Sequence, residues 1–252
     1  MGVDPGVAMG EGAAAGPAIR RVAGRRGIQW VAAAWRDHLA RDPLPWILTT
    51  LLWVALMAAL GFVPLLGPLA QLLTGPALVA GFLLGAAAQA RGEHFAVDHL
   101  FAALARPGQL LLLGALQGAA ALLVLAGAGA AAAALLWGGA LGPSAAALVL
   151  AAVVLFCLLA LAAFWFAPAR VALRGRTAWQ ALRDSLRAVA KNWLPLGLQG
   201  LALFALFLVA LLPLGLGLLL WWPLAAASLY RAHDELFPQA PPPFPTASGD
   251  PP

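Results

Sequence analysis

Residues 43–90 read PLPWILTTLLWVALMAALGFVPLLGPLAQLLTGPALVAGFLLGAAAQA and contain no Asp, Glu, Lys or Arg. One membrane-spanning helix needs roughly 20 apolar residues, so this stretch is long enough for two. The run Pro64-Leu65-Leu66-Gly67-Pro68 lies near its midpoint, where proline and glycine favour a turn over a continuous helix. The stretch therefore predicts a hairpin of two transmembrane helices.

Two further stretches have the same character. Residues 107–169 are free of charged side chains and contain Gly and Pro at 138–143, and residues 192–230 contain Pro and Gly at 212–215. Together the three stretches predict about six spans in three hairpins. Because the third stretch is short for two spans, one long span plus a re-entrant piece is the alternative there.

The composition requires a lipid environment. Of the 252 residues, 63% are hydrophobic and 10% are charged, and the mean hydropathy is +0.88. One soluble core cannot bury so much apolar surface. In lipid only helices and closed barrels satisfy the backbone, and barrel strands alternate apolar with polar residues, which these runs do not. We therefore predict an all-α fold, a polytopic transmembrane helical bundle.

The basic residues predict the orientation. All 15 Lys and Arg residues lie outside the three stretches, so hairpins place them on one side of the membrane. Positive charge marks the cytoplasmic side. We expect a multi-pass protein of the bacterial inner membrane, with both termini in the cytoplasm. The net charge of +5 then reflects topology and anionic lipid headgroups, and we expect no nucleic-acid partner.

The chain divides into one membrane domain with two tails. We expect residues 1–27 to be a disordered cytoplasmic segment and residues 238–252 a disordered Pro-rich tail. Residues 28–237 form the six-helix domain, with a triple repeat over 28–92, 93–175 and 176–237. The repeat is suggested by matches such as AWRDHL at 34–39 and ALRDSL at 181–186.

An amphipathic helix is predicted before each hairpin, and the clearest covers residues 177–191. One face carries Trp179, Leu182, Leu186 and Val189. Thr177 and Gln180 match a capping box. Residues 28–41 and 93–106 have weaker versions. We expect these helices to lie at the headgroup boundary, the alternative being cytosolic helices packed on the bundle. Their exposed cations predict a face for lipids or a partner: Arg36, Arg41, Arg183, Arg187 and Lys191.

Few side chains in the spans suggest a site. Gln71, Gln117 and Gln199 are candidates for lining a cavity, although such residues more often form hydrogen bonds between helices. His94 and Asp98 would share a helical face, but this pattern is weak for a metal and favours a solvated surface. We expect no catalytic, cofactor-binding or metal-binding residues. The pairs Gly81/Gly85 and Gly114/Gly118 predict close helix packing.

Several longer motifs carry a family resemblance. They are GFVPLLGP at 61–68, PALVAG at 76–81, DHLF at 98–101, FWFAPARVAL at 164–173, ALRDSL at 181–186, KNWLP at 191–195 and SLYRAHDELF at 228–237. The chain resembles an uncharacterised family of proteobacterial inner-membrane proteins that is named after a locus tag of the BPSS type. The resemblance covers roughly residues 27–237 and implies an architecture and a compartment, with no activity to carry over.

The sequence favours a non-enzymatic scaffold or accessory membrane protein, which acts through its cytoplasmic face with a membrane-protein partner or as a homo-oligomer. The alternative is a facilitator or exporter of a small neutral or apolar compound. A lipid-modifying enzyme is the least favoured reading, because such chemistry needs acidic, basic or metal groups near the headgroups.

Overall fold

The computed structural model describes residues 19–105, 107–136 and 143–238, and within them every element is a helix. The long helices follow one another in pairs: α2 (Pro43–Gly61) and α3 (Leu66–Ala90), α5 (Gly108–Leu136) and α6 (Pro143–Trp165), and α9 (Trp193–Leu211) and α10 (Leu218–Leu236). The short elements are α1 (Arg26–Ala34), the π-helical η1 (Trp35–Leu39), α4 (His99–Ala102), the 3₁₀-helical η2 (Ala103–Ala105), α7 (Ala167–Arg174) and α8 (Ala178–Lys191).

Five helical segments in the described part are long and apolar enough to cross a membrane. They are α2, α3, Gly108–Ala133 of α5, Ala147–Arg174 across α6 and α7, and α9. The sixth expected span, α10, is not among them, because Arg231, Asp234 and Glu235 lie in its last turns. The protein is therefore an all-helical, multi-pass membrane protein by length and composition.

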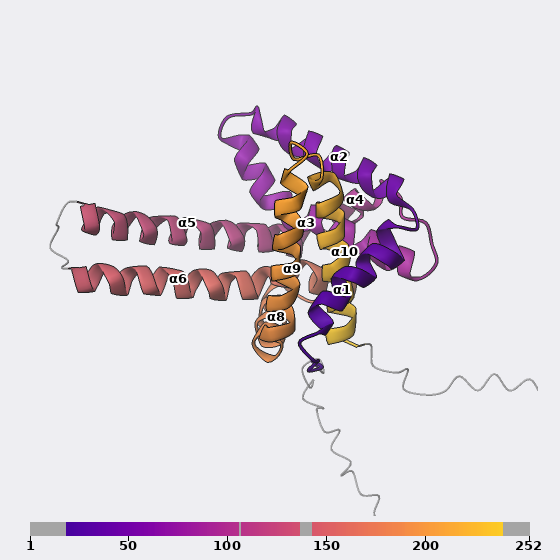
Figure 1. Ribbon diagram of the computed structural model, residues 1–252. Coiled ribbons are helices and arrows are strands. Elements are labelled where there is room, and N and C mark those ends of the chain that lie inside the picture. Colours follow the sequence, from indigo (N-terminus) through magenta and orange to yellow (C-terminus); the bar gives the residue numbers. More distant parts are fainter. Residues whose placement is uncertain (1–18, 106, 137–142, 239–252) are drawn as a thin grey trace, which may run out of the picture.

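The hairpins are not parallel to one another. Figure 1 shows α5 and α6 side by side, projecting to the left across the direction of α9 and α10. Helix α3 lies at the centre and contacts α2, α4, α5, α7 and α10. The predicted bundle of six spans is thus not confirmed in detail, because the hairpins diverge from a shared core. The turn at 137–142 lies outside the described residues.

Small residues bring α3 close to its neighbours. A Cβ atom at Gly81 would lie 2.4 Å from the carbonyl oxygen of Leu100, and one at Gly114 would lie 2.4 Å from the carbonyl oxygen of Leu73. Gly85 faces the ring of Phe95 in the same way. These contacts agree with the predicted packing role of the two glycine pairs, since a side chain at these positions would separate the helices.

The first and last parts of the described chain are joined. The amide of Arg20 donates to the carbonyl of Leu236 at 3.0 Å, and the amide of Val22 donates to Asn192 Oδ1 at 3.0 Å. Helix α1 then packs on α9 and α10. We expected residues 1–27 to be disordered, but residues 19–27 are held by these contacts. Residues 1–18 and 239–252 lie outside the described part of the chain.

The predicted amphipathic helices have different outcomes. Helix α8 forms with the expected capping box of Thr177 and Gln180. Its buried side chains, including Ala181 and Ser185, pack on α6 and α7, which matches the alternative of a helix packed on the protein. The helix expected over 93–106 is wrong, because this segment is irregular before the short α4 and η2.

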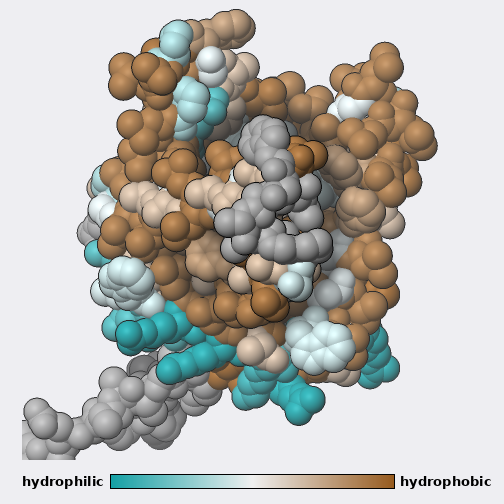
Figure 2. All heavy atoms as spheres, turned by 90° about the vertical axis from the view of Figure 1, so that its left-hand side faces the viewer, coloured by the Kyte–Doolittle hydropathy of each residue, from teal (hydrophilic) through white to brown (hydrophobic). Residues whose placement is uncertain are grey.

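Hydropathy divides the surface into two regions. Figure 2 views the molecule from the left of Figure 1, and hydrophobic residues cover most of this face. Hydrophilic residues gather along the lower edge, on the side of Figure 1 where α8 lies. The large exposed side chains of the hairpins are leucine, valine and phenylalanine, as lipid contact requires.

Candidate functional site

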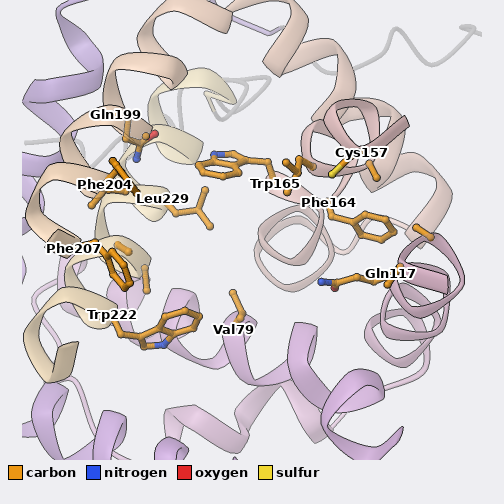
Figure 3. A pocket seen from close by; sticks show the side chains of 18 of the residues that line it. Val79, Gln117, Cys157, Phe164, Trp165, Gln199, Phe204, Phe207, Trp222 and Leu229 are labelled. Carbon is orange, nitrogen blue, oxygen red and sulfur yellow. The ribbon is translucent and has the colours of Figure 1, made fainter. Parts of the chain in front are cut away.

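A cavity of about 970 Å³ lies between the α5–α6 and α9–α10 hairpins. Figure 3 shows Gln199, Phe204 and Phe207 on one side of it, and Phe164, Cys157 and Gln117 on the other. Val79 of α3 and Trp222 of α10 complete the wall. The size falls in the range of small-molecule sites, and the wall is almost entirely apolar.

Gln199 is the most buried polar group in this wall. Its side chain is fully buried, and its Nε2 donates to Ser228 Oγ at 3.1 Å. Ser228 Oγ in turn donates to the carbonyl of Ala225 at 2.9 Å. Gln199 Oε1 has no hydrogen-bond partner among the described residues, and this oxygen lies on the side facing Trp165 in Figure 3. A buried acceptor without a partner is costly, so the position favours a polar ligand group or a side-chain movement.

Tryptophans add donors to the same wall. The Nε1 atoms of Trp165 and Trp222 have no partner within the described chain, whereas Trp221 Nε1 donates to the carbonyl of Leu203 at 2.7 Å. Trp222 also stacks on Trp53 of α2, with ring centroids 4.5 Å apart. This stacking fixes the ring of Trp222, so the wall has a rigid aromatic part.

The three glutamines separate into two groups. Gln117 and Gln199 line the same cavity from opposite hairpins. Gln71 lies elsewhere, and its Nε2 donates to the carbonyl of Met57 within the α2–α3 hairpin. Gln71 therefore forms the interhelical hydrogen bond that was the alternative at the sequence level. The sequence contained no signal for the cavity itself, because its wall combines four hairpin helices with α3.

The basic residues proposed as a lipid or partner face are all exposed. Arg36 lies in η1 and Arg41 follows it, whereas Arg183, Arg187 and Lys191 lie on α8. Exposed indole rings accompany them: Trp35 at 47%, Trp179 at 58% and Trp193 at 69%. Tryptophan beside cations is typical of a membrane interface.

A buried ion pair lies where the sequence analysis expected no site. Arg170 donates to Asp184 at 2.7 Å, and both side chains are less than 5% exposed. Arg176 reaches the same carboxylate at 3.2 Å, and the Arg170 guanidinium lies 4.4 Å from the ring centroid of Phe237. These contacts join α7, α8 and the end of α10. The available signal was a lone arginine after a long apolar run, but its partner is not apparent from the sequence.

Two further polar residues of the core, both histidines, were not predicted from the sequence. His38 Nδ1 lies 2.9 Å from Gln89 Oε1, and the Gln89 Nε2 donates to the carbonyl of His38 at 3.1 Å. His233 is 1% exposed and neither ring nitrogen has a partner in the described part. Burial, with Arg170 and Arg174 nearby, lowers the pKa of His233 to about 3. Both histidines are therefore neutral packing residues at pH 7.

The acidic and histidine cluster at 93–99 does not form a helical face. His94 and Asp98 precede α4, so the spacing of four residues has no helical meaning there. Within the described ranges, no three His, Cys, Asp or Glu side chains group closely enough to hold a metal ion. His99 Nδ1 instead accepts from the amide of Ala96 at 3.1 Å, which closes a local turn.

Comparison with known protein families matches residues 28–248 to a domain of unknown function, DUF7847. Comparison with curated proteins and with solved structures found no match. The expectation of an uncharacterised family is thus confirmed, whereas its proteobacterial naming stays a prediction. Because the match covers almost the entire chain, the protein belongs to the DUF7847 family of unknown function.

Proposed function

We propose that this protein binds a small neutral or apolar compound in the cavity between α5–α6 and α9–α10, and acts as its facilitator or exporter. The observation that carries the proposal is the cavity of about 970 Å³, whose wall contains Gln117, Gln199 and no acidic, basic or histidine side chain. A charged ligand would find no compensating charge there, whereas an apolar one would be well solvated.

The same wall supports a non-enzymatic role. General acid–base chemistry uses His, Asp, Glu, Lys, Tyr or Cys in contact with the reacting group. Cys157 is the one such side chain in the cavity wall, and no base lies beside it in that wall. We further propose an inner-membrane location with both termini in the cytoplasm, supported by the placement of all 15 basic residues outside the apolar stretches.

Pocket filling tests the proposal. Ala121 lines the cavity, and Ala119 on the same helix is exposed outside it. Native mass spectrometry of the protein extracted with minimal detergent should detect a specific small-molecule adduct in the unsubstituted protein and in Ala119→Trp. Ala121→Trp should lose the adduct, because the indole occupies the cavity. An adduct that survives in Ala121→Trp, or its absence from the unsubstituted protein, would contradict the proposal.

A second candidate is a scaffold or accessory role at the cytoplasmic face. The observation that favours it is two groups of exposed cations, one at η1 and one on α8, each accompanied by an exposed tryptophan: Arg36, Arg41, Arg183, Arg187 and Lys191. Such a surface attracts anionic headgroups, each cation near the surface contributing about 1 kcal/mol. A membrane-protein partner or a second copy of this chain would use the same face.

Charge reversal tests this second role. Arg183→Glu/Arg187→Glu should reduce the retention of phosphatidylglycerol over phosphatidylcholine in native mass spectra and release any protein that copurifies at fixed stoichiometry. Arg21→Glu/Arg25→Glu is the matched control, because it changes the charge equally at exposed positions outside the proposed face. If both variants have equal effects, binding depends on the total charge of the protein and not on the proposed face, which contradicts this second role.

A further inference from the structure

Polar segments of the chain lie unusually far along the α9–α10 hairpin. Helix α1 packs on both arms, and Gly27 approaches α9 so closely that a Cβ atom there would lie 1.9 Å from the Pro195 carbonyl and 2.8 Å from the Gln199 amide nitrogen. Arg25, at the N-terminal cap of this helix, and Gln29 within it have exposed side chains. Because these side chains require water or headgroups, the hydrated level reaches about Gln199 on α9.

Contacts of α10, the other arm of the hairpin, indicate the same boundary of the hydrated region. Asp37 of η1 pairs with Arg231 of α10, and Arg36 beside it is exposed. Trp35 lines a cavity of about 500 Å³ together with Leu212, Pro213 and Gly217 at the tip of the hairpin. Trp35 is therefore separated from the tip by no more than one small cavity, and the exposed Arg36 is the next residue along the chain. A tip on the far side of a membrane would lie much farther from this charge.

Helix α9 as a whole is long and apolar enough to cross a membrane, but the parts of the two arms beyond the hydrated level are too short to do so. Residues 200–211 of α9 extend about 18 Å and residues 218–230 of α10 about 20 Å, at about 1.5 Å per residue. The hydrocarbon core is about 30 Å thick. Both arms thus end roughly 10 Å short of the opposite surface, even when they stand perpendicular to the membrane.

The tip itself is built for hydrocarbon. Leu212, Leu214 and Leu216 are 80%, 97% and 67% exposed, and residues 208–220 include no polar side chain. The amides of Leu212, Gly215, Leu216 and Leu218 donate to carbonyls of the same hairpin. A turn in water usually carries Asn, Asp or Ser, whereas a turn in lipid must satisfy its backbone internally.

We infer that the α9–α10 hairpin is re-entrant: it enters and leaves the membrane at the same face, and its tip lies among lipid acyl chains. The two short arms, the ion pair to η1 and the apolar tip all point to this arrangement. The inference is independent of the ligand proposed for the cavity. It keeps both ends of the hairpin on one side, and it explains why α10 is not long and apolar enough to be a span.

Spin-label depth measurement tests the inference. Cys157 is the single cysteine, so a Cys157→Ala background accepts one label at a time. A label at Leu214→Cys reports the depth of the tip. A label at Leu201→Cys, at the exposed middle of α9, is the hydrocarbon reference, and a label at Arg187→Cys is the aqueous reference. Each protein is reconstituted in phosphatidylethanolamine and phosphatidylglycerol vesicles, and collisions are measured with oxygen and with a water-soluble nickel chelate.

A re-entrant tip gives more collisions with oxygen than with nickel at position 214, as at position 201. A crossing hairpin places position 214 at the far aqueous surface, where nickel collisions equal or exceed oxygen collisions, as at position 187, and this result overturns the inference. Leu214 is almost fully exposed, so the label should not unfold the protein. Leu216→Cys, at 67% exposure, repeats the measurement and must give the same sign.

Discussion

A buried pair of charges holds α7 and α8 together. Asp184 accepts from Arg170 and Arg176, and Phe237 covers the Arg170 guanidinium. A carboxylate and a guanidinium so deeply buried are tolerable only as a pair, because each alone would carry its full desolvation cost. The neighbouring helices α7 and α8 are thus joined through one carboxylate, and Phe237 from the end of the described chain packs on the paired guanidinium.

Removal of one partner should therefore be far worse than removal of both. Asp184→Ala leaves Arg170 buried without a counter-charge, and we expect a loss of about 3–5 kcal/mol in the free energy of unfolding. The double variant Arg170→Met/Asp184→Leu should recover most of that loss. Thermal unfolding in detergent checks both. A double variant as unstable as Asp184→Ala would contradict this account.

His233 makes stability depend on pH. In the folded protein its pKa lies at about 3, below the ordinary value of 6.5, because burial and then Arg170 and Arg174 disfavour the charged ring. The unfolded chain binds a proton below about pH 6.5 and the folded chain does not, so stability falls as the pH falls. Between pH 7 and pH 5 this costs about 2 kcal/mol.

The matched variant is His233→Leu, which has a similar volume and no titratable group. Its free energy of unfolding should change less between pH 7 and pH 5 than that of the unsubstituted protein. The measurement is thermal or denaturant unfolding at the two pH values in the same detergent. An unchanged pH dependence in His233→Leu would show that other groups are responsible.

Among the elements, α1 depends for its position on a close backbone contact with α9. Gly27 places α1 against the first turns of α9, where no side chain fits. Trp30 and Val31 then bury their side chains, and Trp30 Nε1 donates to Glu235 at 2.7 Å. Helix α1 is therefore held by shape on one arm of the hairpin and by hydrogen bonds on the other.

A methyl group at position 27 should displace α1. We expect Gly27→Ala to destabilise the protein by about 1–3 kcal/mol, because the Cβ atom overlaps the α9 backbone. Gly197→Ala is the control on α9, since nothing lies within 4 Å of its Cβ position. That variant should be neutral or stabilising by up to about 1 kcal/mol, because alanine is the better helix former. Thermal unfolding separates the two outcomes.

Comparison of the predicted with the observed elements shows which features can be predicted from the sequence. Uncharged apolar stretches predicted the long helices because lipid requires internal backbone hydrogen bonds, and the Thr177 capping box was predicted because it is local. The helix predicted over residues 93–106 does not form, because the packing of Phe95 on Gly85 outweighs the weak helical periodicity of this segment. The Arg170–Asp184 pair, the cavity and the docking of α1 depend on contacts between distant segments, for which one sequence carries no direct signal.

At the scale of the whole molecule, the hairpins serve different ends. The α5–α6 pair is long and projects away from the core, whereas α9–α10 is short and enclosed near its base by α1 and α8. The cavity lies between a long pair and a short one. A ligand there would meet acyl chains on one side and aromatic protein wall on the other, which favours entry from the lipid.

The bonds between residues 19–27 and the end of the chain also set an order of assembly during synthesis. Arg26 pairs with Glu235, and Arg20 bonds to Leu236, so residues near the start of the described chain bind residues near the end of α10. Val31 and Ala34 also pack in a cluster with Leu78 and Phe82 of α3, so part of their surface is available before α9 and α10 are made. The contacts of α1 with the last hairpin can form only after that hairpin has been synthesised, so α1 completes its packing late in assembly.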